Sequence, residues 1–281
     1  MKTLFLGLSE ALRLLFPVAQ GLPPGRSTAW SRSASWIVPL GLFIGLIWAG
    51  LFRITWRVYG EAGNVRVIPA LAIVLIECLL TGPFLALGLA RTAHLLTGIK
   101  PLAATSDARA PLSPVGTLVL CLTVLSEWVL IASIRDDAAW WPSPKDWRSH
   151  FNFMYPAPIY RPLLLAPIWG RWGLLLAASV GRTARGADEA IVALCESMRP
   201  ARMLRHAIVP VALTAIYFSR EGNIFIGLIM ALIVFAATYI VAVVMAQRGG
   251  GQSRQTLFAA GQIAQLAFLA VCRAMWPLIY G

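Results

Sequence analysis

The sequence predicts an all-α integral membrane protein, a polytopic helical bundle formed by a single membrane domain over residues 1–281. Two observations lead to this prediction. Hydrophobic residues make up 58% of the chain and charged residues only 13%, and a soluble domain does not carry so much apolar surface with so few charges. The apolar residues also fall into runs of about twenty, the length that crosses the hydrocarbon core as a helix.

The chain opens with a segment, residues 1–35, that we expect to lie at the membrane interface. Apolar residues recur in it at helical spacing among charged residues such as Glu10 and Arg13, which is the pattern of an amphipathic interfacial helix. Pro23 and Pro24 then break the helix. The apolar positions of the pattern are Leu4, Leu8, Leu12 and Leu15.

About seven membrane segments follow. Pro83 is expected to kink the second of them. The fifth, Met203–Phe218, is short and contains Pro210, so it is either a thin span or a half-helix. The segments are Trp36–Trp56, Val67–Ala90, Pro114–Ile134, Pro158–Val180, Met203–Phe218, Ile224–Ala246 and Thr256–Ile279.

The distribution of basic residues indicates the orientation. If all seven segments cross, the loops on the side of the N-terminus hold more of the 24 Lys and Arg residues than those on the other side. The positive-inside rule then predicts a cytoplasmic N-terminus, and we expect the bacterial inner membrane as the location. This topology places loops 91–113, 181–205 and 247–255 on one face.

The formal charge of +12 is explained by this bias and by contact with anionic headgroups, so no nucleic-acid partner is expected. The lipid bilayer is the expected partner. The four cysteines are far apart and show no metal or disulfide spacing. They are Cys78, Cys121, Cys195 and Cys272.

Residues 135–161 form an unusually long extracytoplasmic loop that is rich in aromatic residues. It is either an interfacial belt at the headgroup layer or a docking surface for a membrane-protein partner. Its aromatic residues include Trp140, Trp141, Trp147, Phe151, Phe153, Tyr155 and Tyr160.

Residues 81–95 read TGPFLALGLARTAHL. This segment resembles the acidic signature of the cobalamin-5′-phosphate synthase (adenosylcobinamide-GDP ribazoletransferase) family, roughly T-G-x-F-H-x-D-G-L-A-D-T-x-D-G. The three family aspartates fall on Leu87, Arg91 and His94. The matching positions are Thr81, Gly82, Phe84, Gly88, Leu89, Ala90 and Thr92.

The resemblance continues along the chain in the same order. Asp107 and Arg109 resemble the family's D-S-R-x-G element, and Gln262 and Gln265 stand where the family often has glutamate. Other similar stretches are 7–18, 35–50, 167–175 and 249–262.

The resemblance implies joining of a ribazole nucleotide to a GDP-activated corrinoid with a divalent cation held by carboxylates. Leu87 offers no ligand for such an ion, and His94 does not prefer Mg²⁺. At about 4 Å and an effective dielectric of 20, the charge of Arg91 would oppose a unit positive charge by roughly 4 kcal/mol. We therefore expect no cofactor, with Mg²⁺ needed only if the chain is an active enzyme.

The remaining candidates fall into three groups. Asp107 and Arg109 are the catalytic candidates that remain. Glu77 and Glu127 are acids buried in spans, where they either serve function or pair with another span. A basic cluster that could bind an anion consists of Arg91, His94, Lys100 and Arg254.

The leading hypothesis is a pseudoenzyme, a cobalamin synthase-like membrane protein that binds an anionic or lipid-like ligand or serves as a membrane subunit. The alternative is an active ribazoletransferase or related phosphotransferase of cobalamin biosynthesis. A second alternative is a structural subunit that docks into a larger membrane complex through residues 135–161.

Overall fold

The computed structural model describes residues 2–17, 19, 27–60, 66–97, 112–134, 156–219 and 224–280. Within these ranges the chain is helical apart from short connections and one isolated bridge, so the predicted all-α fold is confirmed. The elements are α1 (Lys2–Leu15), α2 (Ser27–Thr55), the π-helix η2 (Trp56–Gly60), α3 (Val67–Thr81), α4 (Phe84–Thr97), α5 (Pro114–Ala132), α6 (Tyr160–Ala178), α7 (Glu189–Ser197), α8 (Pro200–Tyr217), α9 (Phe225–Arg248) and α10 (Arg254–Tyr280).

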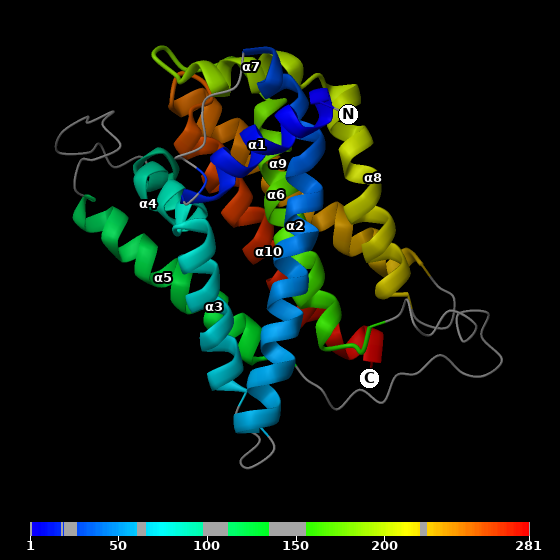
Figure 1. Ribbon diagram of the computed structural model, residues 1–281. Coiled ribbons are helices and arrows are strands. Elements are labelled where there is room, and N and C mark those ends of the chain that lie inside the picture. Colours follow the sequence, from blue (N-terminus) through cyan, green and yellow to red (C-terminus); the bar gives the residue numbers. More distant parts are fainter. Residues whose placement is uncertain are drawn as a thin grey trace.

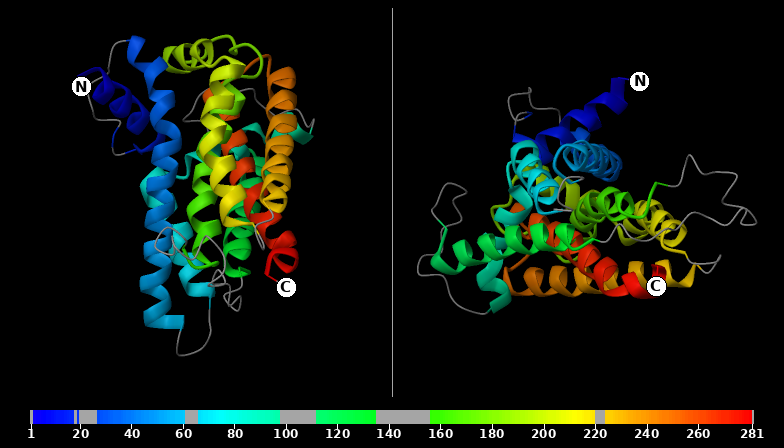
Figure 2. Two further views of the ribbon diagram at one scale, coloured as in Figure 1. Left: turned by 90° about the vertical axis from the view of Figure 1, so that its right-hand side faces the viewer. Right: turned by 90° about the horizontal axis from the view of Figure 1, so that it is seen from below.

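Helix α6 forms the centre of the bundle. Every residue from Arg161 to Ala178 is buried, and α2, α8, α9 and α10 pack around it (Figure 1). Helix α7 lies across the end of the bundle where α6 ends and α8 begins, and α1 packs beside α2 near the same end (Figure 2). Buried residues of all the helices from α1 to α10 therefore contribute to one main core, and a second, small cluster joins α4, α9 and α10.

Glycines allow the central helices to approach closely. A Cβ atom at Gly41 would lie 2.8 Å from the carbonyl oxygen of Pro167, so α2 and α6 touch backbone to backbone there. A Cβ atom at Gly173 would lie 2.7 Å from the Cβ of Ala264, which brings α6 equally close to α10. Small residues at such contacts are typical of helix packing in membranes.

In the part of the chain that the structure describes, four helical stretches are long and apolar enough to cross a membrane. The pair α3 and α4 reaches that standard only together, across an 84° bend, which makes up to five spans. Helix α6, predicted as a span, and α8, predicted as a thin span or a half-helix, are not among them. Helix α6 is enclosed by other helices from Arg161 to Ala178. The four stretches are Arg32–Tyr59, Pro114–Ala132, Phe225–Arg248 and Arg254–Ile279.

The outer helices present large apolar side chains to the surroundings, as a protein embedded in lipid does. Leu79 on α3 is 74% exposed, and Leu122 on α5 and Leu232 on α9 are exposed as well. The protein is therefore an integral membrane protein in contact with lipid.

The N-terminal region differs from the prediction in two ways. The amphipathic helix is present as α1, but it is docked on the bundle, because a Cβ atom at Gly7 would lie 3.0 Å from the carbonyl oxygen of Arg32. The first long helix begins already at Ser27 instead of Trp36, so residues 27–35 are part of α2. Most of the aromatic-rich loop, residues 135–155, lies outside the described residues.

Candidate functional site

The helix is interrupted between α3 and α4, at the start of the motif that resembles the family's acidic signature. Gly82 adopts a left-handed conformation with φ of 60°, which ends α3 and is strained for other residues. A side chain there would also collide with Pro17. Pro83 follows and cannot continue the helix. The predicted kink at Pro83 is therefore a complete break, with α4 leaving at 84° to α3.

Helix α4 carries the three residues that the sequence resemblance aligns with the family aspartates. Leu87, Arg91 and His94 are separated by four and three residues, so they lie on one face of the helix, and all three are half-buried. Gly88, beside this face, holds α4 against the start of α10, because a Cβ atom there would lie 2.8 Å from the carbonyl oxygen of Gln255.

Backbone hydrogen bonds join the turn between α9 and α10 to the segment after α6. The N–H of Gln252 donates to the carbonyl of Arg182 at 2.7 Å, and the N–H of Ala184 donates to the carbonyl of Gln252 at 2.8 Å. Gly251 has φ of 132°, and a Cβ atom there would lie 2.6 Å from the nitrogen of Ala184. Only glycine fits this position, and the turn is firmly held.

The end of α4 joins the same assembly. The guanidinium of Arg248 donates at 2.9 Å to the carbonyl oxygens of Leu95 and Leu96, which satisfies two of the free carbonyls at the end of α4. The described parts of the three loops expected on one face therefore meet at one end of the bundle. We call this region, which consists of the end of α4, the segment after α6 and the turn between α9 and α10, the basic end.

The predicted anion-binding residues of the described chain belong to the basic end. Arg91 and His94 come from α4, and Arg254 from the start of α10. Arg254 forms an ion pair of 3.0 Å with Asp188, both partly exposed. The Nε atom of Arg91 is buried and has no hydrogen-bond partner among the described residues. Lys100, Asp107 and Arg109 lie outside the described residues.

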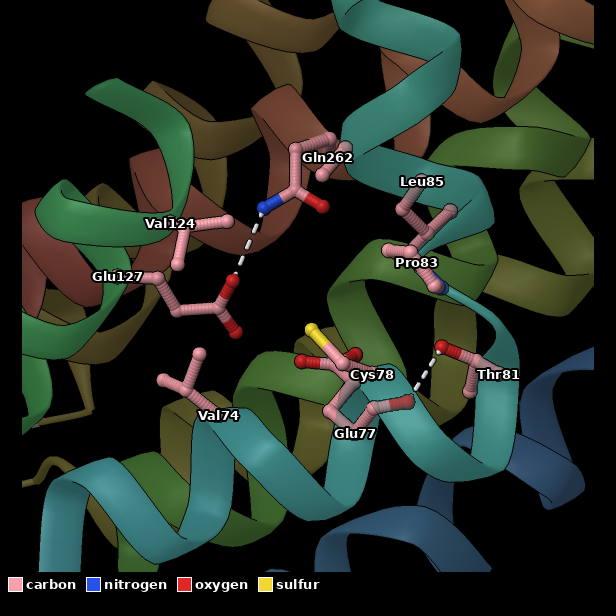
Figure 3. Close-up of a pocket in the computed structure, with 10 residues that line it drawn as sticks. Val74, Glu77, Cys78, Thr81, Pro83, Leu85, Val124, Glu127 and Gln262 are labelled. Atoms are coloured by element: carbon pink, nitrogen blue, oxygen red, sulfur yellow. Dashed lines mark hydrogen bonds between the residues drawn. The ribbon is translucent and has the colours of Figure 1, made fainter. Parts of the chain in front are cut away.

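The two buried acids meet in the interior. Glu77 of α3 is 6% exposed and Glu127 of α5 is 5% exposed. The amide nitrogen of Gln265 donates to both carboxylates, at 3.1 Å to Glu77 and 2.8 Å to Glu127. The amide nitrogen of Gln262 donates to Glu127 at 3.2 Å, as Figure 3 shows.

A buried arginine completes this interior network. The guanidinium of Arg171 on α6 lies 3.1 Å from a carboxylate oxygen of Glu77 and donates to the amide oxygen of Gln265 at 2.8 Å. The partner in another span that the sequence suggested for Glu77 is therefore Arg171. We define the interior network as Glu77, Glu127, Arg171, Gln262 and Gln265, contributed by four helices.

Sequence reasoning did not assemble this network, although one signal was present. Arg171 is an ionisable residue in an apolar stretch, and such a residue requires a counter-charge in a membrane. Glu77 and Glu127 were the acids within predicted spans, so a pairing with Arg171 could have been predicted. The two glutamines gave no such signal, because a neutral amide in a helix does not demand a partner of known charge.

A comparison with known families gives one match. The family model described as cobalamin-5-phosphate synthase matches residues 13–273. The chain belongs to the cobalamin-5-phosphate synthase family. No curated protein and no solved structure matches the chain. The family match includes the basic end, the break between α3 and α4 and the whole interior network, so both polar regions belong to a cobalamin synthase-like membrane protein.

Proposed function

We propose that this cobalamin synthase-like protein binds an anionic or lipid-like ligand at its basic end and does not catalyse metal-dependent phosphoryl transfer. The observation that carries the proposal is the shared face of α4 with Leu87, Arg91 and His94, the three residues that the sequence resemblance aligns with the family's aspartates. In this arrangement a hydrocarbon, a guanidinium and an imidazole stand together where the family resemblance implies carboxylates.

These side chains do not fit Mg²⁺. Magnesium requires hard oxygen ligands in nearly octahedral geometry, and none of the three side chains supplies an oxygen. The charge of Arg91 would add a repulsion, roughly 4 kcal/mol for each unit of positive charge at about 4 Å and an effective dielectric of 20. Within the described residues, no three His, Cys, Asp or Glu side chains are placed to hold a metal together.

The same side chains suit an anion. Guanidinium groups bind phosphate oxygens through paired, charge-assisted hydrogen bonds. The buried Nε–H of Arg91 has no partner among the described residues and can donate a hydrogen bond to an anion. The start of α10 at Arg254 adds the positive end of a helix dipole. Lys100 and Arg109 follow α4 in the sequence and are proposed to contribute further positive charge.

The alternative, an active ribazoletransferase, is favoured by family membership itself. It would require oxygen ligands for the metal from outside the α4 face, and Asp107 is the acid that the resemblance offers. A structural-subunit role would instead depend on residues 135–161 and a membrane-protein partner.

Complementation of a bacterial strain that lacks cobalamin-5-phosphate synthase tests the proposal. We expect no growth on medium that requires cobalamin synthesis, although the protein is present in the membrane fraction by immunoblot. Growth rescue that is lost in Asp107→Ala would overturn the proposal and establish the transferase. The intact synthase in the same vector is the positive control.

A further inference from the structure

A pocket lies where α3 and α4 separate, on one side of the interior network. Its cavity volume is about 20 Å³, enough for a particle the size of a water molecule. Apolar side chains of α3, α4 and α5 form part of its wall. Its polar lining consists of Glu77, Cys78, Thr81, Glu127 and Gln262 (Figure 3).

The helix break itself favours a ligand at this position. Backbone that leaves the helical path within a membrane protein is tolerated where it is enclosed by protein or lines a polar cavity. The last turn of α3, with Cys78 and Thr81, borders the pocket. Carbonyl groups at the end of a helix lack intrahelical partners and carry the negative end of the helix dipole. In broken membrane helices such ends coordinate cations.

The charges around the pocket do not balance. Glu77 and Glu127 bring two carboxylates to the pocket lining, whereas Arg171 brings one guanidinium, which pairs with Glu77 and does not line the pocket. Further hydrogen bonds to the carboxylates come from the neutral amides of Gln262 and Gln265. With both acids ionised, one negative charge is left in excess, and an unbalanced charge inside a membrane protein is costly.

We propose that this pocket binds one small monovalent cation, of which Na⁺ is the probe. One positive charge neutralises the excess, whereas a divalent ion would leave an excess of the opposite sign. The available donors are carboxylate, hydroxyl and amide oxygens, the hard ligands that such a cation prefers. The amide nitrogen of Gln262 is committed to Glu127, and the amide oxygen points toward the open space of the pocket (Figure 3).

Binding of ²²Na⁺ to the purified protein in detergent tests this site, which does not depend on the proposed function. Equilibrium dialysis at fixed pH and ionic strength, with choline as the replacement cation, should give one saturable site per chain. Glu127→Gln removes the excess charge while keeping the shape, so it should abolish saturable binding. Glu196→Gln, the same change on the exposed surface of α7, should leave binding unchanged.

Thermal unfolding supplies a second readout for the same proteins. Raising Na⁺ at constant ionic strength should raise the unfolding midpoint of the wild type and of Glu196→Gln, because a ligand that binds only the folded state stabilises it. The midpoint of Glu127→Gln should not respond to Na⁺. Absence of saturable ²²Na⁺ binding in the wild type, or equal binding in Glu127→Gln, would overturn the proposal. A midpoint that changes with pH but not with Na⁺ would also overturn it, since a proton would then supply the missing charge.

Discussion

The basic end and the interior network both contain charged side chains, but the two regions differ in how exposed these charges are and in how far partner side chains compensate them. At the basic end, Arg254 and Asp188 are partly exposed, and cationic side chains outnumber their partners. In the interior network, Glu77, Glu127 and Arg171 are nearly fully buried, and both carboxylates accept hydrogen bonds from amide or guanidinium donors of other helices.

The difference follows from the surroundings of each region. Water and headgroups screen charges at the end of the bundle, so an excess of arginine is tolerated there and attracts anions. In the interior a charge must be compensated by the protein itself. The interior network is therefore expected to govern stability, and the basic end is expected to govern ligand binding and topology.

The largest expected effect is a loss of stability, and it should differ between the buried ion pair of Arg171 with Glu77 and the partly exposed ion pair of Arg254 with Asp188. Arg171→Met leaves Glu77 buried without its cation, and loss of one partner of a buried pair costs about 3–5 kcal/mol. Arg254→Met removes the partner of Asp188 where solvent screens both groups, for which about 0.2–1 kcal/mol is expected. Unfolding midpoints and the monodisperse fraction in detergent measure both; equal losses in the two variants would contradict the comparison.

The second-largest effect on stability is expected from a change in the spacing between α6 and α10. In Gly173→Ala the added methyl group would lie 2.7 Å from the Cβ of Ala264 and push α6 away from α10, which weakens the contact of Arg171 with Gln265. Overpacking of this kind costs about 1–3 kcal/mol. Gly50→Ala is the matched control, since a Cβ atom there meets nothing within 4 Å. A control that is destabilised as much as Gly173→Ala would show that spacing is not the cause.

A smaller effect is expected on ligand binding at the basic end. A basic residue near an anionic headgroup contributes about 1 kcal/mol, which is roughly fivefold in affinity. Arg91→Gln should therefore lower the occupancy of an added anionic phospholipid, measured by native mass spectrometry. Arg57→Gln changes an exposed arginine of η2 at the opposite end and should leave the occupancy unchanged. Equal loss in both variants would show that overall charge, not the basic end, attracts the lipid.

The smallest effect concerns a thiol beside the basic end. Burial, aided by the carboxylate of Glu196, raises the pKa of Cys195 on α7 to about 11. Because the thiolate is the reactive form and its fraction falls tenfold for each pH unit below the pKa, alkylation at pH 7 should be slow. In a variant with Cys195 as the single cysteine, iodoacetamide labelling should accelerate steadily from pH 7 to pH 10. A rate that levels off near pH 8.5 would show an unperturbed thiol.

Much of this arrangement could be predicted from local sequence. The apolar runs indicated the long helices, and Gly82 and Pro83 indicated an interruption, because their backbone preferences act locally. The extent of the bend depends on packing against Pro17 and α10, which the sequence does not display. The central position of α6 also escaped prediction, since a fully buried helix and a lipid-facing helix are both apolar.

The candidate site also has one part that the local sequence predicts and another that depends on contacts between distant residues. The α4 face of Leu87, Arg91 and His94 follows from helical spacing alone. The pairing of Glu77 with Arg171 joins residues far apart in the chain and depends on the close contacts at Gly170 and Gly173. Gln262 and Gln265 are partners of the acids because α10 brings their amides within hydrogen-bonding distance of Glu77 and Glu127, which the local sequence does not show.

The most direct test of the central claim is turnover by the purified protein, reconstituted in lipid and supplied with Mg²⁺, a GDP-activated corrinoid and a ribazole nucleotide. Chromatography of the products should show no cobalamin product above the level obtained without protein, while an intact synthase of the family forms it under the same conditions. Product formation that requires both this protein and Mg²⁺ would contradict the account.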